Sequence, residues 1–186
     1  DTLTGSDVAD LILTGGTGDD LFDLEPVDTA EVHNITDFES AGAVVGDVIR
    51  LDADNTTVTT AVGAAPVIGT ITATQTTEET AYGTFASGAS NSIDLLIVTA
   101  TNAAGTLASD TADGTNLLTD FIVDPAAGVT VAAGAKFYIL AYDAGNAYLY
   151  YAESANTNLV ASEILPIAKI DSITANALIA DDFILG

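Results

Sequence analysis

Short runs of β-branched and aromatic residues, separated by turns rich in glycine and asparagine, dominate the pattern of apolar and polar positions. Runs of this length and composition predict β-strands. They fall at residues 48–51, 67–73, 93–100, 117–123, 136–142 and 147–152. The tetrapeptide DAGN at 143–146 predicts a hairpin loop between the last two. Helix signals are sparse, and the best is the alanine-rich stretch 174–180, so the pattern predicts an all-β protein.

The first 24 residues differ in pattern from the rest of the chain. They carry regularly placed glycines and aspartates with short apolar pairs, whereas the remainder is rich in Thr, Val and Ala. This change near Pro26 predicts a boundary, with one unit at 1–25 and a β domain at 26–186.

Charge is the most unusual property of the composition. The 186 residues include 27 acidic and 3 basic side chains, a formal charge of −24, yet 48% are hydrophobic and the mean hydropathy is +0.40. The apolar content predicts a folded chain, while the charge disfavours nucleic acid and anionic membranes as partners. The absence of cysteine excludes disulfides and thiolate metal sites. No run of about 18 apolar residues occurs, so no insertion into a membrane is expected.

Residues 15–23, GGTGDDLFD, match every specified position of the nonapeptide G-G-x-G-x-D-x-U-x, in which U is a large apolar residue. The glycines permit a tight turn whose carbonyl groups point at one place, and Asp20 at the sixth position adds a charged oxygen. Hard oxygen ligands of this kind suit calcium. Phe22, at the eighth position, is expected to turn into the interior.

Two partial copies precede this repeat. Residues 5–13 keep Gly5, Asp10 and an apolar residue at the eighth position, and residues 1–4 match the second half of a further repeat. The chain is therefore expected to begin inside a longer array.

Three landmarks follow the repeats in order: NITDFE with GDVIRL within 34–51, the aromatic segment FYILAYDAGNAYLYY at 137–151, and a closing segment at 167–185. With the repeats, they resemble the carboxyl-terminal region of RTX (repeats-in-toxin, haemolysin-type) proteins. These are calcium-binding proteins exported by type I secretion. Residues 55–130 match nothing in this pattern.

The resemblance implies a short calcium-binding parallel β-roll, and we expect it to continue into an antiparallel β-sandwich or flattened barrel. Successive repeats would lie on alternate sides, so that Asp1 and Asp20 face one row and Asp10 the other, with one or two calcium ions in the turns. The candidate metal-binding residues are Asp1, Gly5, Asp7, Asp10, Gly15, Thr17, Gly18 and Asp20. For Asp7 in this set, and for Asp19 outside it, a solvated surface carboxylate is the favoured interpretation.

Other chemistry-bearing residues have simpler interpretations. His33 is the only histidine and is expected to be structural. The aromatic side chains of 137–151 are expected in the core rather than on a sugar-stacking platform. Acidic pairs such as Glu78-Glu79 and Asp181-Asp182 arise by chance among so many acids, and the P-loop, G-x-S-x-G and H-E-x-x-H motifs are absent from the sequence. An enzyme is therefore not expected.

The resulting hypothesis is a calcium-dependent carboxyl-terminal folding and export module of a secreted bacterial RTX protein, located outside the cell or at its surface. Its partners would be calcium and a type I exporter that reads the acidic and then apolar tail at 180–186, ADDFILG. A final core strand is the alternative interpretation of this tail.

A second hypothesis is a structural subunit that self-associates through calcium into an extracellular surface layer or filament. Microscopy with and without calcium distinguishes the two, because an export module stays monomeric while a layer subunit forms ordered assemblies.

Overall fold

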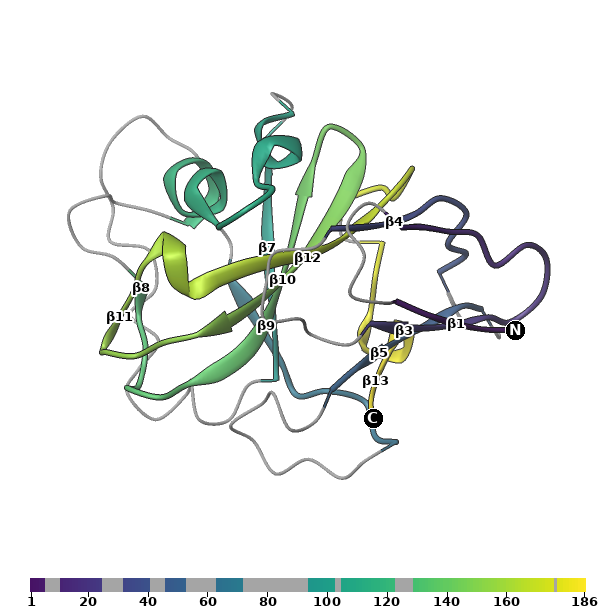
Figure 1. Cartoon of the computed structure of the whole chain (residues 1–186), viewed down its shortest axis with the longest axis horizontal. Helices are drawn as coiled ribbons and strands as arrows, with labels where there is room; N and C mark the ends of the chain where they lie inside the picture. The colour runs from purple at the N-terminus through teal and green to yellow at the C-terminus, as the bar shows by residue number, and fades with distance from the viewer. Residues whose placement is uncertain are drawn as a thin grey trace.

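Two β-sheets form the centre of the computed structural model, which describes residues 1–5, 11–24, 32–40, 46–52, 63–71, 94–102, 105–122, 129–175 and 177–186 (Figure 1). Sheet A has four strands in the order β1-β3-β5-β13, and sheet B has seven in the order β2-β4-β12-β10-β9-β7-β6. A short pair, β8 (Val129–Thr130) with β11 (Asn158–Leu159), stands apart. The all-β class is thereby confirmed.

The strands of sheet A are β1 (Thr2–Thr4), β3 (Leu21–Leu24), β5 (Val48–Leu51) and β13 (Phe183–Leu185). Those of sheet B are β2 (Ile12–Leu13), β4 (His33–Ile35), β12 (Ile164–Ile170), β10 (Asn146–Glu153), β9 (Lys136–Asp143), β7 (Leu95–Asn102) and β6 (Ile68–Ile71).

The first five strands wind as a parallel roll. Strands β1, β3 and β5 pair in parallel in sheet A, and β2 and β4 pair in parallel in sheet B, so successive strands alternate between the sheets. This alternation is the arrangement that the repeat pattern predicts. Near the end of the chain, β12 joins β4 and β13 joins β5, again in parallel. The two sheets therefore continue past residue 25, where the sequence predicts a boundary.

The core lies between the two sheets. Every second side chain along β3, β5 and β13 points inward, and Phe22, Ile49 and Phe183 are fully buried there. This alternation is typical of a strand with one face on the core. Phe22 thus lies inside the roll, as the nonapeptide pattern predicts.

A third layer covers part of the outer face of sheet B. It includes two helical segments, η3 (Thr106–Ser109) and η4 (Leu117–Ile122), and the β8–β11 pair. Leu107 and Leu117 pack there against outward residues of sheet B such as Ile139. These helical segments lie at the upper left of Figure 1, away from sheet A. No helix in the described ranges is long and apolar enough to cross a membrane.

Two sequence-based predictions of local structure are wrong. Residues 117–122, predicted as a strand, form η4, because the Asp110 carboxylate accepts the N–H groups of Asn116 and Leu117 at 2.9 Å each and caps a helical start. Residues 174–180, predicted as a helix, form an irregular connection in the described part, followed by the single turn η6 (Ala180–Asp182). Buried Ile173 and Leu178 hold this connection to the core, and such packing outweighs helix propensity.

Sheet B also differs from the expected antiparallel sandwich. Strands β9, β10 and β12 are antiparallel, as the aromatic hairpin predicts, but β7 runs parallel to β9 and β6 parallel to β7. The hairpin itself is confirmed, with a two-residue turn at Ala144 and Gly145, both at positive φ.

The aromatic residues of the hairpin lie in the core, as expected. Phe137, Tyr138, Tyr142, Tyr148, Tyr150 and Tyr151 are all at most 7% exposed. None of these six presents the open ring face that a sugar-stacking platform needs.

Burial of Tyr142 predicts that its phenol ionises only at high pH and that this ionisation destabilises the folded chain. Burial, assisted by the nearby Asp182 carboxylate, raises the pKa of Tyr142 to about 12. The folded chain therefore keeps this proton at pH values where the unfolded chain has lost it. The contribution of the buried, neutral phenol to folding stability is complete below pH 10 and is lost as the pH rises through about 12. The difference between ultraviolet absorbance titrations of the wild type and Tyr142→Phe is expected to show a midpoint near 12. A midpoint near 10 would contradict this assignment.

Candidate metal centre

The glycine-rich turn links β2 in sheet B to β3 in sheet A. Gly16 and Gly18 adopt φ values of +95° and +112°, which side-chain-bearing residues rarely adopt. The turn thereby changes direction sharply and brings Asp20 to the first position before β3. This local geometry explains why the nonapeptide specifies glycines at these places.

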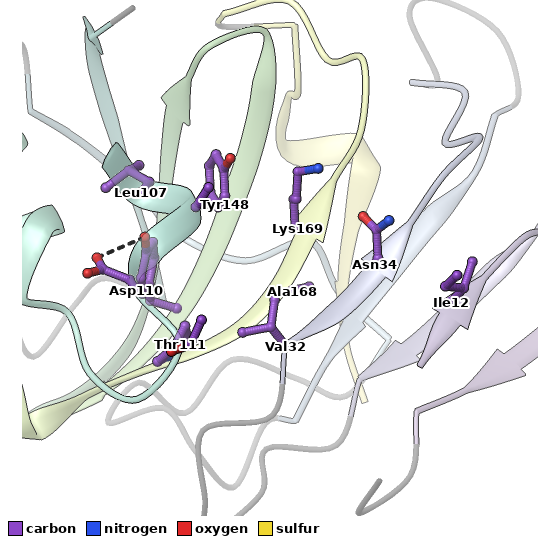
Figure 2. A pocket seen from close by; sticks show the side chains of 12 residues that line it. Ile12, Val32, Asn34, Leu107, Asp110, Thr111, Tyr148, Ala168 and Lys169 are labelled. Atoms are coloured by element: carbon purple, nitrogen blue, oxygen red, sulfur yellow. Dashed lines mark hydrogen bonds between the residues drawn. The ribbon is translucent and has the colours of Figure 1, made fainter. Parts of the chain in front are cut away.

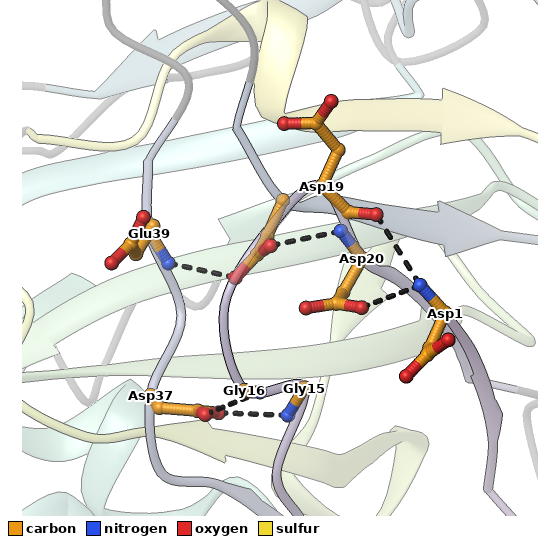
Figure 3. Close-up of polar contacts among 8 residues, drawn as sticks. Asp1, Gly15, Gly16, Asp19, Asp20, Asp37 and Glu39 are labelled. Carbon is orange, nitrogen blue, oxygen red and sulfur yellow. Dashed lines mark hydrogen bonds and ion pairs between the residues drawn. The ribbon is translucent and has the colours of Figure 1, made fainter.

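Asp20 is the buried acid of the turn, with 4% of its surface exposed. Its Oδ1 lies 2.6 Å from the amino nitrogen of Asp1 (Figure 3), whereas its Oδ2 is enclosed and has no hydrogen-bond partner in the part of the chain that the structure describes. A Cβ atom at Gly15 would lie 2.5 Å from that Oδ2, so only glycine fits there. The ammonium group of Asp1 forms an ion pair with Oδ1 alone, so Oδ2 is left as a buried acceptor, which is costly unless a proton or a second cation binds it.

Two carboxylates from the following coil support the turn from its other side. Asp37 accepts hydrogen bonds from the N–H groups of Gly15 and Gly16 (Figure 3). Asp47 accepts them from the N–H groups of Asp20 and Glu39. Asp47 is only 2% exposed. Hydrogen bonds from N–H groups to an ionised carboxylate are among the stronger ones in proteins, so these two aspartates fix the backbone around Asp20.

The structure brings some of the predicted residues together and not others. Asp1 and Asp20 precede strands β1 and β3, which pair with Thr2 opposite Leu21, so both lie in one row as the repeat stacking predicts. Gly15, Thr17 and Gly18 form the turn beside them. Gly5 lies elsewhere: its N–H donates to the Asp23 carbonyl, and a Cβ there would approach the buried His33 ring to within 2.8 Å.

Asp7 and Asp10 lie outside the described residues, so their predicted roles are untested. His33 is buried at 1% exposure, as its expected structural role requires. Asp19, expected on the surface, is exposed.

The residues around Asp20 suit calcium in part. Calcium takes about six to eight oxygen ligands, and no three Asp, Glu or His side chains in the described ranges converge closely enough to hold an ion alone. The unpaired oxygen of Asp20 and the backbone carbonyl groups of the glycine-rich turn are the groups that would hold calcium here. The remaining ligands would have to come from further carbonyl groups and water.

Sequence reasoning missed the supporting aspartates, Asp37 and Asp47. Both lie in the segment 34–51 that resembles the family's post-repeat landmark. That pattern marks their positions but not their hydrogen-bond partners, which depend on how the coils stack.

A separate groove of about 410 Å³ crosses the outer face of sheet B (Figure 2). One row of its floor is set by strand register: Ile12, Asn34, Lys169 and Tyr148 stand side by side on β2, β4, β12 and β10. Its charged groups already have partners, because Lys169 pairs with Asp171 at 2.5 Å and Asp110 accepts bonds from Asn116, Leu117 and Tyr150. Burial nevertheless raises the pKa of the Asp110 carboxyl.

Comparison with protein-family models, with curated proteins and with solved structures finds no match to this chain.

Proposed function

We propose that this chain is a calcium-binding carboxyl-terminal folding and export module of a secreted bacterial protein similar to the RTX group. The observation that supports it most is the buried, unpaired Oδ2 of Asp20 at the sixth position of the nonapeptide turn. The parallel roll around that turn is the fold in which such repeats are expected to bind calcium. Metal binding rather than catalysis is the chemistry that this arrangement favours.

The high negative charge of the chain would couple calcium binding to folding. At −24 the chain repels itself when it is compact, and a divalent cation held only by the folded state offsets part of this repulsion. Binding free energy then becomes folding free energy. In the low calcium of a bacterial cytosol the chain would stay open, and in the calcium-rich medium outside it would fold.

The export part of the proposal rests on the tail. Asp181 and Asp182 precede the apolar run Phe183–Leu185, the pattern that resembles a signal read by type I exporters. In the folded chain this run is strand β13, with Phe183 and Leu185 fully buried. Under this proposal the exporter reads the tail before folding, and the same residues complete sheet A afterwards.

Calcium is expected to raise the melting temperature of the wild type. At about a hundredfold over Kd, calcium stabilises the folded state by roughly 2.7 kcal/mol if it binds only that state. Asp20→Asn is expected to lose most of this stabilisation, because it removes the charge of the buried acid. Asp19→Asn is the matched control, since it removes an equal charge from the exposed neighbour, and it is expected to keep the stabilisation.

Differential scanning calorimetry in calcium, in magnesium and in chelator provides the measurement. Magnesium is expected to act weakly, because it demands near-octahedral geometry. Identical melting curves of the wild type in calcium and in chelator would refute the calcium proposal. Equal responses of the two variants would show that Asp20 is not the ligand.

A further inference from the structure

The Asp37 carboxylate lies against the backbone of the glycine-rich turn and binds it at two points. Its Oδ1 is 3.0 Å from the Gly15 nitrogen, and its Oδ2 is 2.7 Å from the Gly16 nitrogen. Figure 3 shows both bonds reaching from the coil after β4 to the turn after β2. Each carboxylate oxygen thus accepts one backbone N–H, so Asp37 is bonded to the backbone of the turn itself.

Strand pairing sets this contact. In the parallel pair β2–β4, Leu13 is opposite Ile35, and the hydroxyl groups of Thr14 and Thr36 lie 3.0 Å apart one step further along. Continuing the same register places Asp37 opposite Gly15. The contact is therefore a consequence of how two coils of the roll stack.

Gly15 has Asp37 on one side and Asp20 on the other. Its N–H points to Asp37, while the direction of its missing Cβ points at the unpaired Oδ2 of Asp20. In a planar trans peptide the carbonyl group points opposite to the N–H group. The carbonyl groups of the peptides that Asp37 binds are therefore held pointing away from Asp37.

We propose that Asp37 is a positioning residue for the calcium site: it fixes the Thr14–Gly15 and Gly15–Gly16 peptides so that the turn presents its carbonyl groups and Asp20 in one arrangement. This inference rests on the proposed calcium function. Glycine-rich backbone is the most flexible backbone a protein can offer, so a turn that binds an ion gains affinity when a neighbouring group holds it in the bound shape. Ligand orientation by such supporting groups commonly changes metal affinity by about 10- to 100-fold.

The test compares Asp37→Asn with Asp19→Asn in the full chain. Both remove one negative charge near the turn, but only the first replaces one of the two oxygens that accept backbone N–H groups by an NH2 group, which cannot accept one. Calcium titration calorimetry is expected to show Kd raised about tenfold or more in Asp37→Asn, with a smaller change in Asp19→Asn. Discrimination between calcium and magnesium is expected to fall in Asp37→Asn alone, because a loosened turn no longer selects for ion size.

Amide hydrogen exchange provides a second measurement that does not depend on the metal. In chelator, the Gly15 and Gly16 amides are expected to exchange faster in Asp37→Asn than in the wild type, while amides of the β9–β10 hairpin stay protected, which shows that the chain still folds. Loss of hairpin protection together with unchanged calcium affinity of the folded fraction would make Asp37 purely structural and overturn the inference.

The outcomes also separate this inference from the proposed function. Calcium binding by the wild type with an unchanged Kd in Asp37→Asn overturns only the positioning role. Absence of calcium binding by the wild type overturns the proposed function, and the positioning role with it.

Discussion

Replacing Phe183 by alanine is expected to lower the free energy of unfolding by about 4 kcal/mol. The Phe183 side chain is fully buried, and its strand lies beside β5, with Phe183 opposite Ile49. Gly63 and Ala64 bond to Leu185 on the other edge of β13, so little room exists for the strand to move and fill the space left by the ring. Large cavities that cannot collapse are the costly ones.

Ile184→Ala is the matched control for this prediction. Ile184 lies on the same strand but on its opposite, partly exposed face, so the change is expected to cost less than about 1.5 kcal/mol. Chemical denaturation of both variants gives the comparison. Equal denaturation midpoints for the two variants would show that β13 is not the core strand described above.

Changing Phe183, Ile184 and Leu185 together to serine is expected to reduce secretion to near background when the whole chain is fused to a passenger in a cell with a type I exporter. The proposed signal is read in the unfolded chain, so the exposure of each residue in the folded state does not matter. Secreted and retained passenger, measured by immunoblot of medium and cells, give the readout.

Ile49→Ser separates loss of the signal from loss of stability. Ile49 is as fully buried as Phe183 and lies opposite it in sheet A, so its replacement damages the same core while the tail keeps its sequence. Secretion of this control is expected to continue. Undiminished secretion of the triple variant would show that the tail serves the fold alone.

The aromatic hairpin was the most predictable part of the fold. Strands β9 and β10 follow from their runs of β-branched and aromatic residues, and Gly145 and Asn146 mark the loop between them. The positive φ of Ala144 is not predicted by its residue type. Both signals are local in sequence. The nonapeptide is local too, because its glycines and inward Phe22 are specified by backbone geometry within nine positions.

The errors arose where contacts with residues outside the segment decide its structure. Residues 117–122 have a strand-like composition, but the carboxylate of Asp110 caps them as a helix and they pack on the outer face of sheet B. The parallel order of β6, β7 and β9 likewise has no local signal, since strand pairing depends on the path of the intervening chain.

The residues of the nonapeptide in the candidate site could be predicted from the sequence, but the aspartates that support them could not. The sixth position of the nonapeptide identifies Asp20 as a candidate ligand. The stacking of every second repeat places Asp1 beside it. Asp37 and Asp47 accept hydrogen bonds from main-chain N–H groups of another coil, and the sequence pattern that contains them does not show which N–H groups these are. Only the structure of the stacked coils shows that Asp37 and Asp47 are hydrogen-bonded to the backbone, whereas Oδ2 of Asp20 has no partner in the described residues.

The joining of β12 to β4 and of β13 to β5 gives this small domain a high contact order. The side chains of Asn34 and Asp171, for example, bond to each other although they are 137 positions apart. Contacts between such distant segments form slowly, because the chain loses the entropy of closing a long loop before it gains the free energy of the contacts. The roll begun by β1 to β5 is therefore expected to close only after β12 and β13 have joined it. Under the proposed export, a chain that leaves through a narrow channel would stay unfolded until both partner segments are outside.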